Sequence, residues 1–229
     1  MVRKKPVTAE EFLAKLRGDH AYVAKMDAQA KRAAEIEGVE REVMAALASR
    51  GYSAASLKEL QEEFAPFPTE LANNLVEMLR RVTDTNVLEA IVRALGATRG
   101  GFDASPMTKL YDETDAPSLR WAIANTLAEA RPTASAAWLL LRAQDHRLGQ
   151  AREMLPLAVA RTSPPDIANP ALVRLLAEMP GHAALGLAES GGLGELAPLK
   201  QAYHRAQGWE REQVGRAIAI IERRAQEGG

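Results

Sequence analysis

Hydrophobic residues recur along almost the whole chain in steps of three and four positions, the spacing of an amphipathic helix. No segment alternates convincingly between apolar and polar residues as a strand would. One long helix is predicted over residues 20–49, where Ile36, Val39, Val43 and Leu47 form an apolar stripe. The first half of this helix is rich in alanine and charged residues, so it has helix propensity but little surface to bury. We therefore expect an all-α protein whose long helix docks on the rest of the chain or projects from it.

Capping signals and prolines divide the rest of the chain into shorter elements. Ser56 and Glu59 have the spacing of a capping box, which predicts a short helix to about residue 64. The clearest break is Pro-Phe-Pro at residues 66–68. Beyond it the pattern predicts helices at 69–82, 85–97, 105–113, 117–130, 134–144, 147–161, 169–179, 181–190, 194–206 and 209–225. Pro156 should kink the helix that contains it, because proline lacks the N–H that a helix interior needs, unless the helix starts later than residue 147.

The apolar stripes of alternate helices repeat at a regular interval, which leads from Val87 to Leu119 and from Leu119 to Ala151. Three copies align well: Val87, Ile91 and Leu95; Leu119, Ile123 and Leu127; Ala151, Leu155 and Val159. Two further copies match only in part. In the fourth copy Ala183 and Leu187 are apolar, but the third position falls on Gly191. In the fifth copy the interval is shorter by one position; Val214 and Ile218 match, and Ile221 is the apolar residue nearest to the third position. One helix pair cannot cover its own apolar faces, so stacked pairs would bury a shared core between neighbours.

The repeated segment reads NVLEAIVRALG at residues 86–96 and SLRWAIANTLA at residues 118–128. In this pattern the chain resembles the HEAT-like repeat family over about residues 67–225. The resemblance implies a right-handed α–α superhelix of about five helix pairs, an α-solenoid, over residues 66–229. Residues 1–65 lie outside the repeat, and we expect them to form an N-terminal helical cap over the apolar edge of the first repeat.

Composition narrows the classes of function. The 229 residues include 29 basic and 30 acidic side chains, and nucleic-acid binders usually carry a clear basic excess. Residues 51–115 hold 6 basic and 11 acidic side chains, which makes them an acidic zone. The chain has no cysteine, so disulfides, thiol catalysis and cysteine-ligated zinc are excluded and a cytoplasmic location is expected. No run of 18 apolar residues is present, and no membrane association is expected.

No group of residues has the spacing of a catalytic or metal-binding motif. The four histidines, His20, His146, His182 and His204, share no metal-ligand spacing. The glycines of residues 191–194 follow no strand, so they do not predict a phosphate-binding loop. We therefore expect no catalytic residue, no metal site and no cofactor.

A binding face is the more plausible functional feature. The resemblance implies that the second helix of each pair lines the concave side of the solenoid. On the 117–130 helix, Trp121 and Asn125 point nearly opposite to the apolar stripe. The repeat interval relates Glu89 to Trp121 and Arg120 to Arg152, and twice that interval leads from Arg152 to Arg216. The candidate partner-binding residues are Glu89, Arg93, Arg120, Trp121, Asn125, Arg152 and Arg216. The alternative is that Trp121 fills the gap between repeats and the arginines are only solvated.

The leading hypothesis is a non-catalytic protein-binding solenoid: a scaffold, an inhibitor or an immunity-type protein. It would hold another protein on its concave second-helix face or on the acidic zone, which suits a basic partner. The main alternative is nucleic-acid binding, since a family of DNA alkyl-base glycosylases is also built from HEAT-like repeats. The near-zero net charge weighs against that alternative, because phosphate contacts dominate DNA affinity. A lyase or chaperone subunit is a third possibility, which no residue favours.

Overall fold

The structure is a computed structural model that describes residues 20–132 and 136–227, so positions 1–19 of the predicted cap lie outside the described residues. The described part is all-α, as predicted, with an isolated bridge between Phe67 and Thr98 as its one β-type contact. Its α-helices are α2 (His20–Ala48), α3 (Leu57–Phe64), α4 (Thr69–Met78), α5 (Thr85–Leu95), α6 (Ser105–Glu113), α7 (Pro117–Ala130), α8 (Ala136–Gln144), α9 (Leu155–Thr162), α10 (Pro165–Leu175), α11 (Pro180–Ser190), α12 (Leu196–Arg205) and α13 (Gly208–Glu227). Two 3-10 helices are η1 (His146–Arg152) and η2 (Leu193–Glu195).

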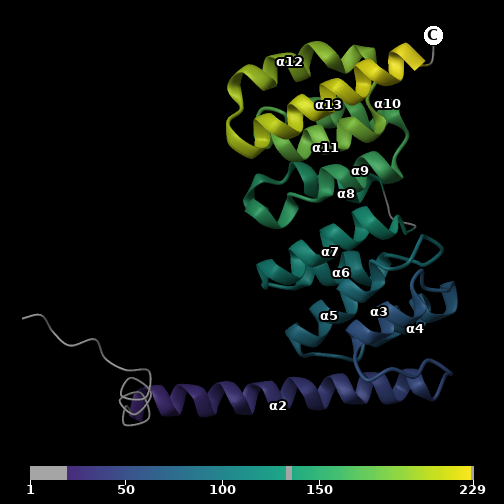
Figure 1. Cartoon of the computed structure of the whole chain (residues 1–229), viewed down its shortest axis with the longest axis vertical. Coiled ribbons are helices and arrows are strands. Elements are labelled where there is room, and N and C mark those ends of the chain that lie inside the picture. The colour runs from purple at the N-terminus through teal and green to yellow at the C-terminus, as the bar shows by residue number, and fades with distance from the viewer. Residues whose placement is uncertain (1–19, 133–135, 228–229) are drawn as a thin grey trace, which may run out of the picture.

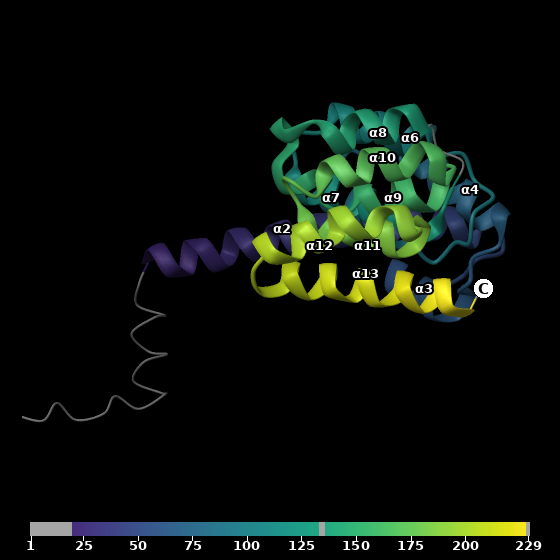
Figure 2. The same ribbon diagram turned by 90° about the horizontal axis from the view of Figure 1, so that it is seen from above.

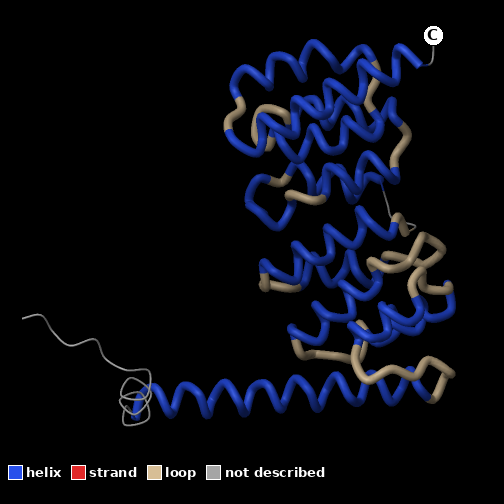
Figure 3. The backbone as a smooth tube through the Cα atoms, viewed as in Figure 1, coloured by secondary structure: helices blue, strands red, loops and turns tan. Residues whose placement is uncertain are grey.

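Alternate helices form a continuous row through the molecule. The helices α5, α7, α9, α11 and α13 each pack against the next, and we call them the second helices. The helices α4, α6, α8, α10 and α12 each pack against the second helix that follows, and we call them the first helices. The pairs stack along the long axis of the molecule (Figure 1), and loops join the helices (Figure 3). This arrangement is compatible with a helical repeat solenoid; the hand of its superhelix and the number of repeats stay predictions.

The long helix α2 both docks and projects. Its C-terminal end contributes three buried side chains to the core, Val43, Met44 and Leu47. Residues 20–35 are all exposed, and this part of α2 extends beyond the stack of helices (Figures 1 and 2). The guanidinium of Arg32 donates a hydrogen bond of 2.6 Å to Asp84, whose carboxylate also caps the first turn of α5. The middle of α2 is therefore tied to the first helix pair.

The predicted apolar stripes form the core that joins neighbouring pairs. Thirteen residues of these stripes are at most 4% exposed: Val87, Ile91, Leu95, Leu119, Ile123, Leu127, Ala151, Leu155, Val159, Ala183, Leu187, Val214 and Ile221. In the last copy the predicted member Ile218 is only half-buried, and Ile221, the nearest apolar substitute, is buried. In the weak fourth copy, Gly186 brings α11 close to α9, since a Cβ at Gly186 would lie 2.8 Å from the carbonyl oxygen of Pro156.

The largest differences from the predicted helices lie at residues 147–161 and 169–179. The predicted 147–161 helix is divided into η1, which contains a kink where Gly149 has φ of 54°, and α9, in whose first turn Pro156 lies. The 169–179 prediction is wrong at both ends, because α10 begins at Pro165 and ends at Leu175 with Pro170 in its interior. Pro165 starts the helix without loss, since a first-turn N–H has no partner within the helix. Ser56 caps α3 as predicted, accepting a hydrogen bond of 3.1 Å from the Glu59 N–H.

Candidate functional site

Three of the predicted binding residues meet on adjacent second helices. Glu89 and Arg93 lie one turn apart on α5, and the Arg93 Nη2 atom is 2.7 Å from Oε1 of Glu89. The guanidinium carbon of Arg93 lies 5.7 Å from the centroid of the half-buried Trp121 ring on α7. The carboxylate thus holds the guanidinium, and the guanidinium covers the indole by a cation–π contact. We call Glu89, Arg93 and Trp121 the Trp121 cluster.

The remaining predicted residues on this face lie apart from the Trp121 cluster. Asn125 is half-buried one turn beyond Trp121 on α7. Arg216 lies on α13, at the opposite end of the stack from α5, and pairs with Glu212 one turn earlier at 2.6 Å. Both side chains of that pair are more than half exposed, so the pair is solvated.

Arg120 and Arg152 lie between helices and not on the exposed face. Arg120 Nε donates a hydrogen bond of 3.0 Å to the carbonyl oxygen of Tyr111. Arg152 is 6% exposed; its Nη1 donates to the carbonyl oxygen of Ala143 at 2.9 Å and its Nη2 to Glu178 at 2.6 Å. The predicted ladder of Arg120, Arg152 and Arg216 is therefore not a continuous exposed surface, because two of its members bond to backbone carbonyls.

The acidic zone is largely neutralised by its own neighbours. At least seven of its eleven carboxylates form ion pairs with Lys or Arg: Glu62, Glu77, Asp84, Glu89, Asp112, Glu113 and Asp115. Several partners come from outside the zone, among them Arg32, Arg50 and Arg142. The zone therefore presents less unpaired negative charge than its sequence suggests.

A cavity of about 420 Å³ opens between η1, the start of α11 and the start of α13. Its lining includes seven polar or aromatic side chains: Gln150, Arg152, Glu153, Glu178, His182, Trp209 and Glu210. We call it the Trp209 cavity. The rings of His182 and Trp209 are 4.8 Å apart between centroids, and His182 Nε2 lies 3.7 Å from Oε2 of Glu153. Burial lowers the pKa of His182, outweighing the opposite effect of Glu153 and Glu210, and so favours the neutral form of this histidine.

The sequence did not predict the Trp209 cavity. Its members come from segments that are far apart in the chain and meet only because the pairs stack. One signal was present: the repeat interval that relates Glu89 to Trp121 leads on from Trp121 to Glu153 in the next pair. Trp138, by contrast, packs edge-on against Tyr111, and its indole N–H donates a hydrogen bond of 3.0 Å to Asp112.

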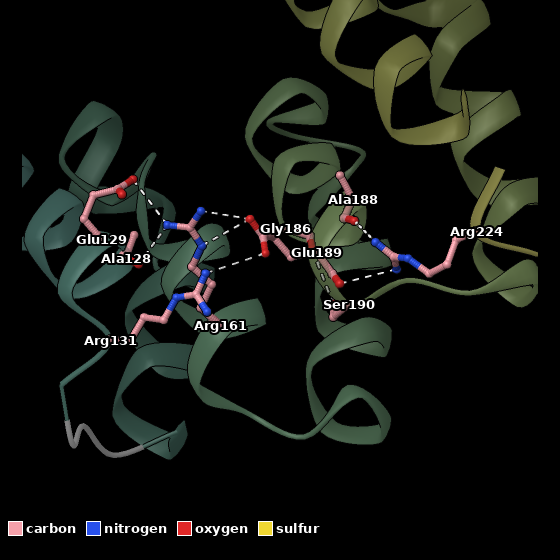
Figure 4. Close-up of polar contacts among 9 residues, drawn as sticks. All are labelled: Ala128, Glu129, Arg131, Arg161, Gly186, Ala188, Glu189, Ser190 and Arg224. Atoms are coloured by element: carbon pink, nitrogen blue, oxygen red, sulfur yellow. Dashed lines mark hydrogen bonds and ion pairs between the residues drawn. The ribbon is translucent and has the colours of Figure 1, made fainter. Parts of the chain in front are cut away.

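Arginines also fasten the C-terminal ends of the second helices (Figure 4). Arg161 of α9 donates to the Ala128 carbonyl oxygen at 3.0 Å and pairs with Glu189 of α11 at 2.8 Å. Arg224 of α13 donates to the Ala188 carbonyl oxygen of α11 at 2.7 Å. Helix C-termini leave carbonyl groups without intrahelical partners, and these side chains supply the missing donors. The network therefore joins consecutive second helices.

Across residues 20–132 and 136–227, no three His, Asp or Glu side chains converge to hold a metal ion. No helix in these ranges combines the length and the apolar character that a bilayer crossing requires. Comparison of the chain with protein-family models, with curated proteins and with solved structures gave no match.

Proposed function

We propose that this protein is a non-catalytic binding protein, a scaffold or inhibitor, that holds a partner protein on the exposed face of its second helices. The observation that carries this proposal is the Trp121 cluster, in which Arg93 lies over a half-buried indole and is itself held by Glu89. Tryptophan and arginine are the residues most enriched at interface hot spots. Because the ion pair fixes Arg93 before binding, less side-chain entropy is lost when a partner covers it.

We further propose that the architecture is a HEAT-like solenoid, a right-handed superhelix of about five pairs with residues 1–65 as its cap. The regular repeat of the buried stripes and the packing of each second helix on the next support this proposal. Stacked repeats leave one long face of their second helices open, and such faces suit the binding of extended or globular partners.

Nucleic-acid binding has less support than protein binding. A basic groove for nucleic acid would need Arg120, Arg152 and Arg216 on one exposed surface beside Trp121. Arg120 and Arg152 bond to backbone carbonyls, so two of the three cations are turned away from a ligand. The surviving cation, Arg216, is paired with Glu212.

Affinity capture with matched variants tests the proposed function. Wild type, Trp121→Ala and Arg93→Ala are used as baits in native lysate, with Arg41→Ala as control, since Arg41 is an exposed arginine of α2 paired with Glu37. We expect a protein whose recovery falls at least about tenfold with each of the first two variants and is unchanged with the control. Circular dichroism confirms that every bait is folded. A partner retained fully by Trp121→Ala, or salt-sensitive nucleic acid in place of protein, contradicts the proposal.

A further inference from the structure

We propose that the Trp209 cavity binds a lysine or arginine side chain of the partner protein. This inference rests on the proposed function in one respect, namely that a partner protein supplies the cation. The recognition of the cation depends only on the residues that line the cavity. Glu153 lies one repeat interval beyond Trp121, and neighbouring packed helices lie about 10 Å apart. A protein seated on the Trp121 cluster would therefore reach the cavity by extending along the same face.

The charges that line the cavity favour a cation. Arg152 is already paired with Glu178, so these two groups neutralise each other. Glu153 and Glu210 remain, and among the described residues neither has a Lys or Arg partner. His182 Nε2 lies 3.7 Å from Oε2 of Glu153, but burial favours the neutral form of this histidine. The cavity thus holds two carboxylates without a compensating cation.

The aromatic wall makes the cavity specific for an organic cation. Trp209 borders the open cavity and is 47% exposed, although tryptophan is highly buried on average in folded proteins. Its ring packs directly against Gly181, where no larger residue would fit, because a Cβ there would lie only 2.4 Å from Cζ3 of Trp209. The ring is also held against His182, so one part of the indole is fixed and the rest is open. Tryptophan is the best cation–π acceptor, and carboxylates beside it complete the recognition of an ammonium or guanidinium group.

The buried arginine fixes this arrangement. Arg152 is 6% exposed; its bond to the Ala143 carbonyl links η1 to α8, and its bond to Glu178 links η1 to the segment between α10 and α11. Its Nε is also buried and has no hydrogen-bond acceptor among the described residues. The position of Glu178 at the cavity is therefore set by a residue that solvent does not reach, while Glu153 and Glu210 stay open to a ligand.

Titration of the full chain with small probes tests the chemistry without the partner. The probes are acetyl-Gly-Arg-Gly-amide, the same peptide with citrulline in place of arginine, and spermidine. The readout is the indole N–H resonance of Trp209. We expect the arginine peptide to shift this resonance saturably, and the isosteric but uncharged citrulline peptide to leave it unmoved. Glu153→Gln and Glu210→Gln should each weaken the arginine peptide about tenfold. Glu212→Gln, further along α13 and paired with Arg216, is the control and should leave it unchanged.

Three results would overturn the inference: no saturable binding of the arginine peptide, equal binding of the citrulline peptide, or equal loss with the control variant. If spermidine binds at least tenfold more tightly than the arginine peptide, the cavity is a site for a free amine. That result would overturn the proposal that a partner protein supplies the cation. Trp121→Ala should not alter peptide binding, so failure of the proposed face and failure of the cavity are separable. In lysate capture, a partner lost with Glu210→Gln but kept with Trp121→Ala would retain the cavity and reject the face.

Discussion

Arg152 repeats the contact of Arg120 one layer further along the stack. Each donates a hydrogen bond to the carbonyl oxygen nine residues earlier, Arg120 to Tyr111 at 3.0 Å and Arg152 to Ala143 at 2.9 Å. Both carbonyls lie within the last turn of a first helix, where acceptors lack intrahelical donors. The repeat is therefore present in polar contacts as well as in the apolar stripes.

Replacing Arg152 should destabilise the fold. Arg152→Ala leaves the Ala143 carbonyl without its donor and opens a gap between η1 and α8, so we expect a loss of about 2–3 kcal/mol in the free energy of unfolding. Arg152→Lys should not restore it, because one ammonium cannot serve both Ala143 and Glu178 as the guanidinium fork does. Urea denaturation measures the loss. Arg216→Ala is the control and should stay within about 0.5 kcal/mol of wild type; an equally small effect for Arg152→Ala would contradict the assigned role.

The contact between Arg93 and Trp121 should be measurable as a coupling. In a double-mutant cycle of Arg93→Ala and Trp121→Leu, we expect a coupling of about 0.5–1 kcal/mol in unfolding free energy, the range for a solvent-exposed cation–π pair. Repeating the cycle with Glu89→Gln should reduce the coupling, since Glu89 holds the guanidinium in place. Additive effects of the two changes would show that the ring and the cation do not interact in solution.

The close approach of α11 to α9 should depend on a glycine. In Gly186→Ala the new Cβ would meet the Pro156 carbonyl oxygen at 2.8 Å and Leu172 at 3.0 Å, so the helices must separate. We expect destabilisation of about 1–3 kcal/mol. Gly194→Ala is the matched control, because nothing lies within 4 Å of a Cβ there. Equal melting temperatures for the two variants would show that α9 and α11 can separate without loss of stability, which would contradict the prediction.

Stability should depend on pH through His182. Burial lowers its pKa in the folded chain below the ordinary 6.5 that applies when the chain is unfolded. Below pH 6.5 the unfolded chain therefore binds more protons, and the free energy of unfolding falls as the pH drops from 6.5 towards the folded-state pKa. Wild type should lose more stability than His182→Gln between about pH 7.5 and 5.5. A His204→Gln variant, which changes an exposed histidine, should follow wild type, and parallel curves for all three proteins would refute the prediction.

The local signals of the sequence predict much of the fold. The helices Ser105–Glu113 and Pro117–Ala130 were predicted to the residue, because a proline in the first turn marks each start. The error at α10 has the same origin, since the 169–179 prediction places Pro170 in the first turn of the helix, whereas α10 begins at Pro165 and Pro170 lies in its interior. The regular interval between the apolar stripes predicted which side chains are buried, because stacked helix pairs cover each other's apolar faces.

The functional residues were harder to predict, because the direction of a long polar side chain is set by acceptors that the sequence does not reveal. Arg120 and Arg93 look equivalent as exposed positions, yet one bonds to the Tyr111 carbonyl and the other lies over Trp121. His182 and Trp209 are far apart in the chain, and only the stacking of α13 on α11 brings their rings together.

The exposed part of α2 gives the molecule a spacer. At about 1.5 Å per residue, the helix from residue 20 to residue 35 spans roughly 24 Å, comparable to the diameter of a small domain. The Arg32–Asp84 ion pair fixes its direction near the base, so the tip keeps a defined position relative to the second helices. The N-terminal end of α2 is therefore held at a distance from the row of second helices.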